Sequence, residues 1–259
     1  MKDEKYAVYV NGDSQTIGTD LADNCASYPY YLVRDMNGVI IENPAIGGAS
    51  NDRILRTTHQ YLDDCERNDR TLASSVDDAF PDFVIIGWTE YNRYDWFYQG
   101  KMRTANAELD GLGPEETNLE QNQARGAWQN FHLGNPANAA AQIAYYYNQM
   151  MNLHDRLRYL KIPHLFLNAH AGFYDNYGAE HRGNAIATEL FEEFDWQNCF
   201  WNVFSKTDCS FTSWAGRRNY KHVPGWHYEH KAHIDFGQYL YEYVQQMGLM
   251  DMYKDKKSV

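Results

Sequence analysis

The chain has too few basic residues for a typical nucleic-acid-binding protein. Its 259 residues include 23 Lys and Arg against 35 Asp and Glu, so the formal net charge is −12 at neutral pH. Such a surplus of negative charge repels phosphate backbones instead of attracting them. We therefore expect no nucleic-acid partner.

Cysteine is scarce as well, with four residues at positions 25, 65, 199 and 209 and no CxxC spacing. This pattern favours thiols over disulfides and argues against a zinc site built from cysteines. The charged residues 1–5 run directly into an apolar segment, without the apolar stretch of a signal peptide. No apolar run reaches transmembrane length. We expect a soluble chain without a cleaved signal or a membrane partner.

The remaining composition is that of a globular protein, and its length suits one large α/β domain. Hydrophobic residues make up 44% and charged residues 22%, whereas the aromatic fraction of 15% is high. Aromatic rings in such numbers often line sites for sugars or other organic ligands.

Short apolar runs alternate with helical patterns along the chain. Strands are expected at residues 6–10, 39–41, 83–86, 164–167 and, more weakly, 199–204. Helices are expected at residues 50–67, 139–160 and 232–247. This alternation predicts a parallel, doubly wound sheet that binds ligands beyond the carboxyl ends of its strands.

One segment, at about residues 94–138, interrupts the alternation because it is rich in Gly, Pro, Asn and Gln. It is too long for an ordinary connection. We interpret it as an insertion or lid, and a surface loop with one or two short helices fits the sequence equally well.

Four turn motifs fall at equivalent ends of successive elements. Gly12-Asp13-Ser14 follows the first strand and presents a serine hydroxyl on a sharp turn, although an ordinary Asx-turn uses the same residue types. The other motifs are Ile46-Gly47-Gly48-Ala49, Gly87-Trp88-Thr89-Glu90 and Gly225-Trp226-His227.

This ordered set resembles the SGNH (GDSL-type) hydrolase superfamily, which comprises serine esterases and lipases, over nearly the whole chain. The resemblance implies a single domain over residues 1–259, folded as a flavodoxin-like three-layer α/β/α sandwich with a parallel sheet. It also implies that Ser14 is the nucleophile, that Asp13 orients the turn and that His227 is the base. Gly48 would supply a backbone N–H to the oxyanion hole.

The sequence departs from the family pattern at two positions. Thr89 stands where the third motif usually has an oxyanion-donating Asn, and a threonine hydroxyl can donate one hydrogen bond. Pro224 stands where the fourth motif usually has the acid of the triad. A backbone carbonyl could then hold Nδ1 of His227, or a carboxylate such as Asp208 or Glu229 could replace the acid. The sequence leaves both alternatives open. The resemblance suggests that phage and marine-microbial members share both departures.

Other side chains are expected to contact the substrate. Rings after the third motif line the mouth of the cleft or pack beneath the lid. Arg93 pairs with an acidic substrate, or with Glu90 or Asp95, and His170 contacts substrate or caps the end of its strand. The expected substrate-binding set is Asp13, Trp88, Glu90, Tyr91, Arg93, His170 and Trp226.

Three histidines, His227, His230 and His233, are spaced by three residues, a pattern that also occurs in metal sites. The final helix of the family often carries a second histidine six residues after the base, so His233 is interpreted as a packing residue. We expect neither a metal nor a cofactor.

The leading hypothesis is a serine esterase that acts on a short acyl group carried by a carbohydrate. A catalytically weak or inactive carbohydrate-binding or virion-associated protein with the same fold is the alternative, and a histidine-based metallohydrolase is a third class. The expected location is the cytoplasm, or the virion if a phage encodes the chain. The oligomeric state stays open.

Overall fold

The structure, a computed structural model, describes residues 5–22, 26–70, 80–91, 93–98, 101–106, 136–170, 194–203, 205, 207–223 and 227–253. In chain order the elements are β1 Tyr6–Asn11, α1 Ser14–Ile17, α2 Tyr28–Asp35, β2 Gly38–Glu42, α3 Asn51–Arg70, β3 Phe83–Trp88, β4 Arg93–Tyr98, β5 Lys101–Asn106, α5 Pro136–Tyr159, β6 His164–Asn168, α8 Phe211–Arg217, α9 His230–Gln246 and the 3₁₀ turn η2 Leu249–Asp251.

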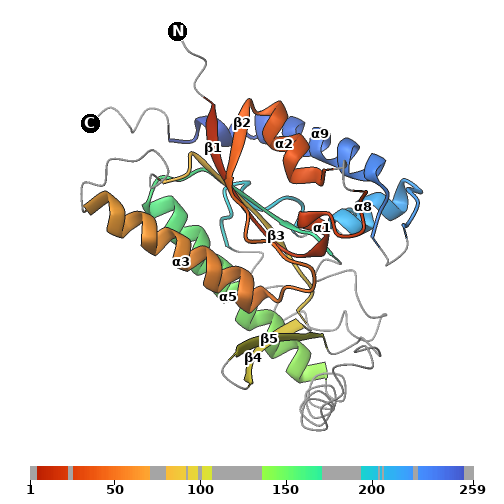
Figure 1. Cartoon of the computed structure of the whole chain (residues 1–259), viewed down its shortest axis with the longest axis horizontal. Coiled ribbons are helices and arrows are strands. Elements are labelled where there is room, and N and C mark those ends of the chain that lie inside the picture. The colour runs from red at the N-terminus through yellow and green to blue at the C-terminus, as the bar shows by residue number, and fades with distance from the viewer. Residues whose placement is uncertain are drawn as a thin grey trace.

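The fold is α/β, built on a four-stranded parallel sheet with the strand order β2-β1-β3-β6. Helices α3 and α5 cover one face of the sheet, and α2 and α9 cover the other (Figure 1). The predicted parallel, doubly wound arrangement is therefore confirmed at this level.

Alternating side chains of the central strands supply two hydrophobic cores, one on each face. In β3, Val84, Ile86 and Trp88 pack toward α3 and α5, whereas Phe83 and Ile85 pack toward α2 and α9. This is the two-residue periodicity of a strand that is buried on both faces. It explains why the central strands are continuous apolar runs.

The predicted strands and long helices agree with the structure to within a few residues, but other elements differ. Helices α2 and α8 were not predicted. The expected strand at 199–204 is reduced to a single parallel bridge between Phe166 and Phe200, so it does not form a full fifth strand within the described residues. Cys65, Cys199 and Cys209 are buried and form no disulfide among the described residues, while Cys25 lies outside them.

The segment at 94–138, expected to be a lid or loop, begins as an antiparallel hairpin of β4 and β5. Its end belongs to α5, which starts at Pro136. Residues 107–135 lie outside the described residues.

Among the described residues, none of the helices combines the length and the apolar character needed to cross a membrane.

Several histidines are buried in the two cores. His154 Nδ1 and His164 Nε2 are 2.8 Å apart and share a hydrogen bond, while His164 Nδ1 lies 3.1 Å from the Ile162 carbonyl oxygen. On the other face, His233 Nδ1 accepts a hydrogen bond from the Tyr28 backbone N–H. Burial lowers the pKa of both His164 and His233 to about 3. The folded chain therefore holds these rings neutral near pH 7.

We predict that His233 makes stability depend on pH. The unfolded chain protonates this ring below about pH 6.5 and the folded chain does not, so its contribution is present above pH 6.5 and is lost as the pH falls. Between pH 7.5 and 5.5 the ring should remove about 1.4 kcal/mol from the free energy of unfolding.

The measurement is denaturant unfolding at both pH values for the wild type and His233→Asn, whose side-chain oxygen can still accept from Tyr28. The variant should lose about 1.4 kcal/mol less than the wild type between the two pH values. The exposed His222 serves as the control, and His222→Asn should leave the difference unchanged. Equal losses in the wild type and His233→Asn would contradict the prediction.

Candidate active site

Ser14 lies at the carboxyl edge of the sheet, three residues beyond the end of β1. It is the first residue of the short helix α1, and Asp13 caps that helix by accepting a hydrogen bond from the Gln15 N–H at 3.1 Å. The cap fixes the turn, as the sequence predicted for Asp13. Ser14 is 5% exposed, so its hydroxyl is held at the edge of the protein interior.

Two glycines allow the ends of β1 and β3 to lie against α1. An ideal Cβ placed on either Gly12 or Gly87 would lie 2.2 Å from the Thr16 hydroxyl oxygen, which is too close for any side chain. Thr16 in turn shares a hydrogen bond with the buried Tyr28 hydroxyl at 3.0 Å. This packing fixes the position of Ser14 relative to the third motif.

The second motif offers a free backbone donor. Gly48 has a φ of +74°, a conformation that side chains rarely adopt, and no atom lies within 4 Å of its ideal Cβ. Within the described residues, no acceptor receives the backbone N–H of Gly48 or of Ser14.

Thr89 is fixed by its backbone and leaves its hydroxyl unused. Asn51, the first residue of α3, accepts from the Thr89 N–H at 3.0 Å and donates to the Thr89 carbonyl at 3.1 Å. The buried Thr89 hydroxyl has no hydrogen-bond partner among the residues that the structure describes. An unpaired buried hydroxyl costs free energy, so it is a candidate for contact with a ligand.

His170 is the hydrogen-bond partner of Ser14. Its Nε2 lies 3.2 Å from the Ser14 hydroxyl oxygen and 3.1 Å from a carboxylate oxygen of Asp13. Its Nδ1 faces Glu90 at 3.9 Å. The sequence had placed His170 at the ligand edge, and the structure brings it to the candidate nucleophile.

A buried arginine completes this cluster. Nη1 of Arg93 lies 3.5 Å from Oδ2 of Asp13, and Nε lies 3.6 Å from Oε2 of Glu90. Nη2 of Arg93 lies 3.4 Å from Nε2 of His170. The expected pairing with Glu90 is therefore present, and Asp95 pairs with Arg56 instead, at 2.8 Å. The Arg93 carbonyl also accepts from the Tyr146 hydroxyl, which ties β4 to α5.

Nε2 of His170 has neighbours of opposite charge. Burial lowers the pKa of His170, Asp13 opposes this shift, and the charges of Arg93 and His227 add to it, so the ring is neutral near pH 7. Nε2 faces a carboxylate oxygen of Asp13, which accepts hydrogen bonds, and Nη2 of Arg93, which donates them. The Asp13 contact favours a proton on Nε2, and the Arg93 contact favours a lone pair there.

His227 has a carboxylate partner that the sequence did not reveal. Its Nδ1 lies 2.7 Å from a carboxylate oxygen of Asp20, which follows α1. Of the two alternatives, the structure has a carboxylate from elsewhere in the chain at this nitrogen, and not a backbone carbonyl. The other expected acids are engaged elsewhere, Asp208 with Arg217 and Arg218, and Glu229 with the Lys221 N–H. No hydrogen bond joins His227 to Ser14 in the described part of the chain.

The remaining expected site residues fall into two groups. Trp88 is fully buried and Tyr91 is 7% exposed, and both belong to the core between the sheet and α3 and α5, so they do not line a cleft mouth. Pro224 and Trp226 lie outside the described residues. His230 contacts the Tyr31 hydroxyl and His233 bonds the Tyr28 backbone, so the three spaced histidines do not converge on one point.

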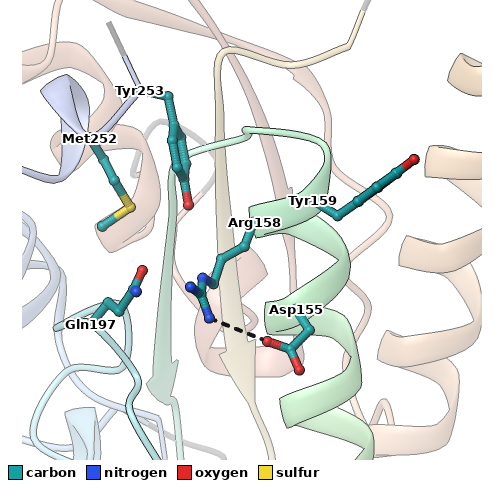
Figure 2. A pocket seen from close by; sticks show the side chains of 6 residues that line it. All are labelled: Asp155, Arg158, Tyr159, Gln197, Met252 and Tyr253. Atoms are coloured by element: carbon teal, nitrogen blue, oxygen red, sulfur yellow. Dashed lines mark ion pairs between the residues drawn. The ribbon is translucent and has the colours of Figure 1, made fainter. Parts of the chain in front are cut away.

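A separate cavity of about 530 Å³ lies at the opposite edge of the sheet, beside the end of α5 that precedes β6 (Figure 2). Arg158 and Asp155 are among the residues that line this cavity, and they form an ion pair with 3.5 Å between Nη1 and Oδ1. Ligands of parallel α/β sheets bind at the carboxyl edge. The edge that holds Ser14 is therefore the better candidate.

Comparison with models of protein families gives no match, and comparison with curated proteins finds no similar sequence.

Proposed function

We propose that the protein is a serine ester hydrolase of the SGNH type, in which Ser14 attacks the carbonyl carbon of an ester. The observation that carries the proposal is the placement of Ser14 at the first turn of a helix on the carboxyl edge of a parallel sheet. The strand order β2-β1-β3-β6 supports it, since flavodoxin-like sheets begin in the same order.

His227 is the general base in this proposal. The serine must lose its proton to an imidazole nitrogen that has a free lone pair. In this proposal His170, which lies between Asp13 and Arg93, orients the Ser14 hydroxyl and does not take its proton. His227 directs Nδ1 toward Asp20, which leaves Nε2 as the acceptor.

The negative charge of the tetrahedral intermediate needs donors that are already in place. The backbone N–H groups of Ser14 and Gly48 and the Thr89 hydroxyl supply them, and all three are without a partner in the described structure. Because these donors are unpaired before the reaction, no bond within the protein must break when the charge forms.

The substrate class follows from the polarity around Ser14. Asp13, Glu90, Arg93 and His170 form a network of charged and polar groups, and His170 connects this network to the Ser14 hydroxyl. The hydroxyls of a carbohydrate can bond to such groups, whereas a long acyl chain cannot. We therefore assign the ester to a small acyl substituent of a sugar.

We predict that Ser14→Ala abolishes hydrolysis of p-nitrophenyl acetate, by about a thousandfold or more, because it removes the nucleophile. A fluorophosphonate probe should label the wild type and leave the variant unlabelled. The far-UV circular dichroism spectrum and the denaturant unfolding of the variant should match the wild type. A wild type that neither labels nor turns over would identify an inactive member with the same fold.

We predict that replacing His227 by glutamine lowers kcat more than replacing His170 by glutamine. Glutamine places an N–H close to the position of Nε2 but cannot accept a proton as a base. His227→Gln should therefore lower kcat by about a hundredfold or more, whereas His170→Gln should keep kcat within about tenfold of the wild type. A larger loss for His170→Gln than for His227→Gln would exchange their roles.

We predict that Thr89→Val lowers kcat by about a hundredfold without lowering the free energy of unfolding. Valine has nearly the same shape as threonine, and the hydroxyl that it removes is buried without a partner. The control is Thr58→Val, because the Thr58 hydroxyl bonds to Asn11 and Tyr9. That variant should lose stability and retain kcat. A Thr89→Val variant that only raises KM would place Thr89 in the substrate pocket instead.

A further inference from the structure

We propose that Asp20 is the acid that positions His227, in place of the acid that the fourth motif lacks. This inference rests on the proposed function, because a positioning acid has meaning only if His227 is the base. The positioning acid would then lie on the segment that carries Ser14, and not on the segment that carries His227.

The contact itself has the geometry of a histidine-carboxylate pair. Nδ1 of His227 and Oδ2 of Asp20 are 2.7 Å apart, within the range for a charge-assisted hydrogen bond. The carboxylate accepts the Nδ1 proton, so the neutral ring has its lone pair on Nε2. The His227 side chain is 12% exposed and that of Asp20 39%, so the bond is partly shielded from water.

The backbone around Asp20 holds the carboxylate in place. Helix α1 ends after a single turn, Gly18 adopts the left-handed conformation, and the Thr19 N–H donates back to the Ser14 carbonyl at 2.9 Å. Asp20 itself has a φ of +67°, which Asp and Asn tolerate better than most residues. The acid is therefore connected to the nucleophile by a short, hydrogen-bonded stretch.

The other carboxylates near the site have different partners. Asp13 and Glu90 face Arg93 and His170, and Asp208 pairs with two arginines. Glu229 accepts from the backbone of Lys221. Within the described residues, Asp20 is the carboxylate that lies within hydrogen-bond distance of His227.

The test compares Asp20→Asn and Asp20→Gly with the matched control Asp208→Asn. Asparagine and glycine both accept a positive φ, so neither strains the backbone. Both Asp20 variants should lower kcat for p-nitrophenyl acetate by about a hundredfold or more, with little change in KM, because the acid stabilises the imidazolium that forms in the transition state. Asp208→Asn should keep kcat near that of the wild type.

A spectroscopic measurement separates positioning from a merely structural role. In ¹⁵N NMR spectra the wild-type His227 should show its proton on Nδ1, and Asp20→Gly should shift it toward Nε2. Denaturant unfolding should show each variant to be as folded as the wild type.

The outcomes keep the two proposals apart. Unchanged kcat and an unchanged tautomer in the Asp20 variants of an active enzyme would overturn the role of Asp20 and leave the esterase standing. A wild type that shows neither turnover nor fluorophosphonate labelling would overturn the esterase, and the role of Asp20 with it.

Discussion

The candidate site depends on one packing constraint, the close approach of the ends of β1 and β3 to the first turn of α1. Thr16 occupies the space that a side chain on Gly12 or Gly87 would need. Its hydroxyl bonds to Tyr28, which belongs to the core beneath α2 and α9. Because interiors are close-packed, the position of Ser14 is set by the core and not by its own loop.

The charges beside Ser14 add a second constraint. Arg93 and Asp13 are both buried, and removing ions from water costs several kcal/mol per ion unless each finds partners. Arg93 has Asp13 and Glu90, and Asp13 in turn has Arg93, His170 and the Gln15 N–H. Removal of one member would leave a buried charge without compensation. The network therefore holds His170 in contact with Ser14.

Much of the fold followed from patterns in the sequence. The central strands are buried on both faces and are therefore apolar runs, and α3, α5 and α9 are long enough to show helical periodicity. The sequence does not predict helix α2, because the helix has only eight residues, with Pro29 near its start. Several tyrosines also take the place of a clear apolar stripe. The segment at 199–204 is apolar enough for a strand, yet in its described residues, 199–203, the pairing with β6 is the single bridge at Phe200.

The site residues were predictable where a motif places them beside a strand end. Gly12-Asp13-Ser14, Gly48 and Thr89 each follow a strand, so the parallel sheet places them at one edge. The orientation of His170 was not predictable, because it depends on Asp13 and Arg93, which come from two other segments. The aromatic residues that follow Trp88 in the sequence suggested a position at the cleft. Side chains alternate between the two faces of β3, however, and this places Trp88 in the core beside α3 and α5.

The pairing of His227 with Asp20 shows why a missing motif residue is weak evidence against a mechanism. A motif records an acid at a fixed spacing in the sequence, whereas the chemistry requires only a carboxylate oxygen near Nδ1. The two residues are 207 positions apart, and no local pattern could connect them. The sequence has Pro224 where the motif has its acid, and the turn after α1 supplies a carboxylate to His227. A carboxylate on the segment of the candidate nucleophile also couples the two positions, since a shift of α1 would move Ser14 and the partner of His227 together.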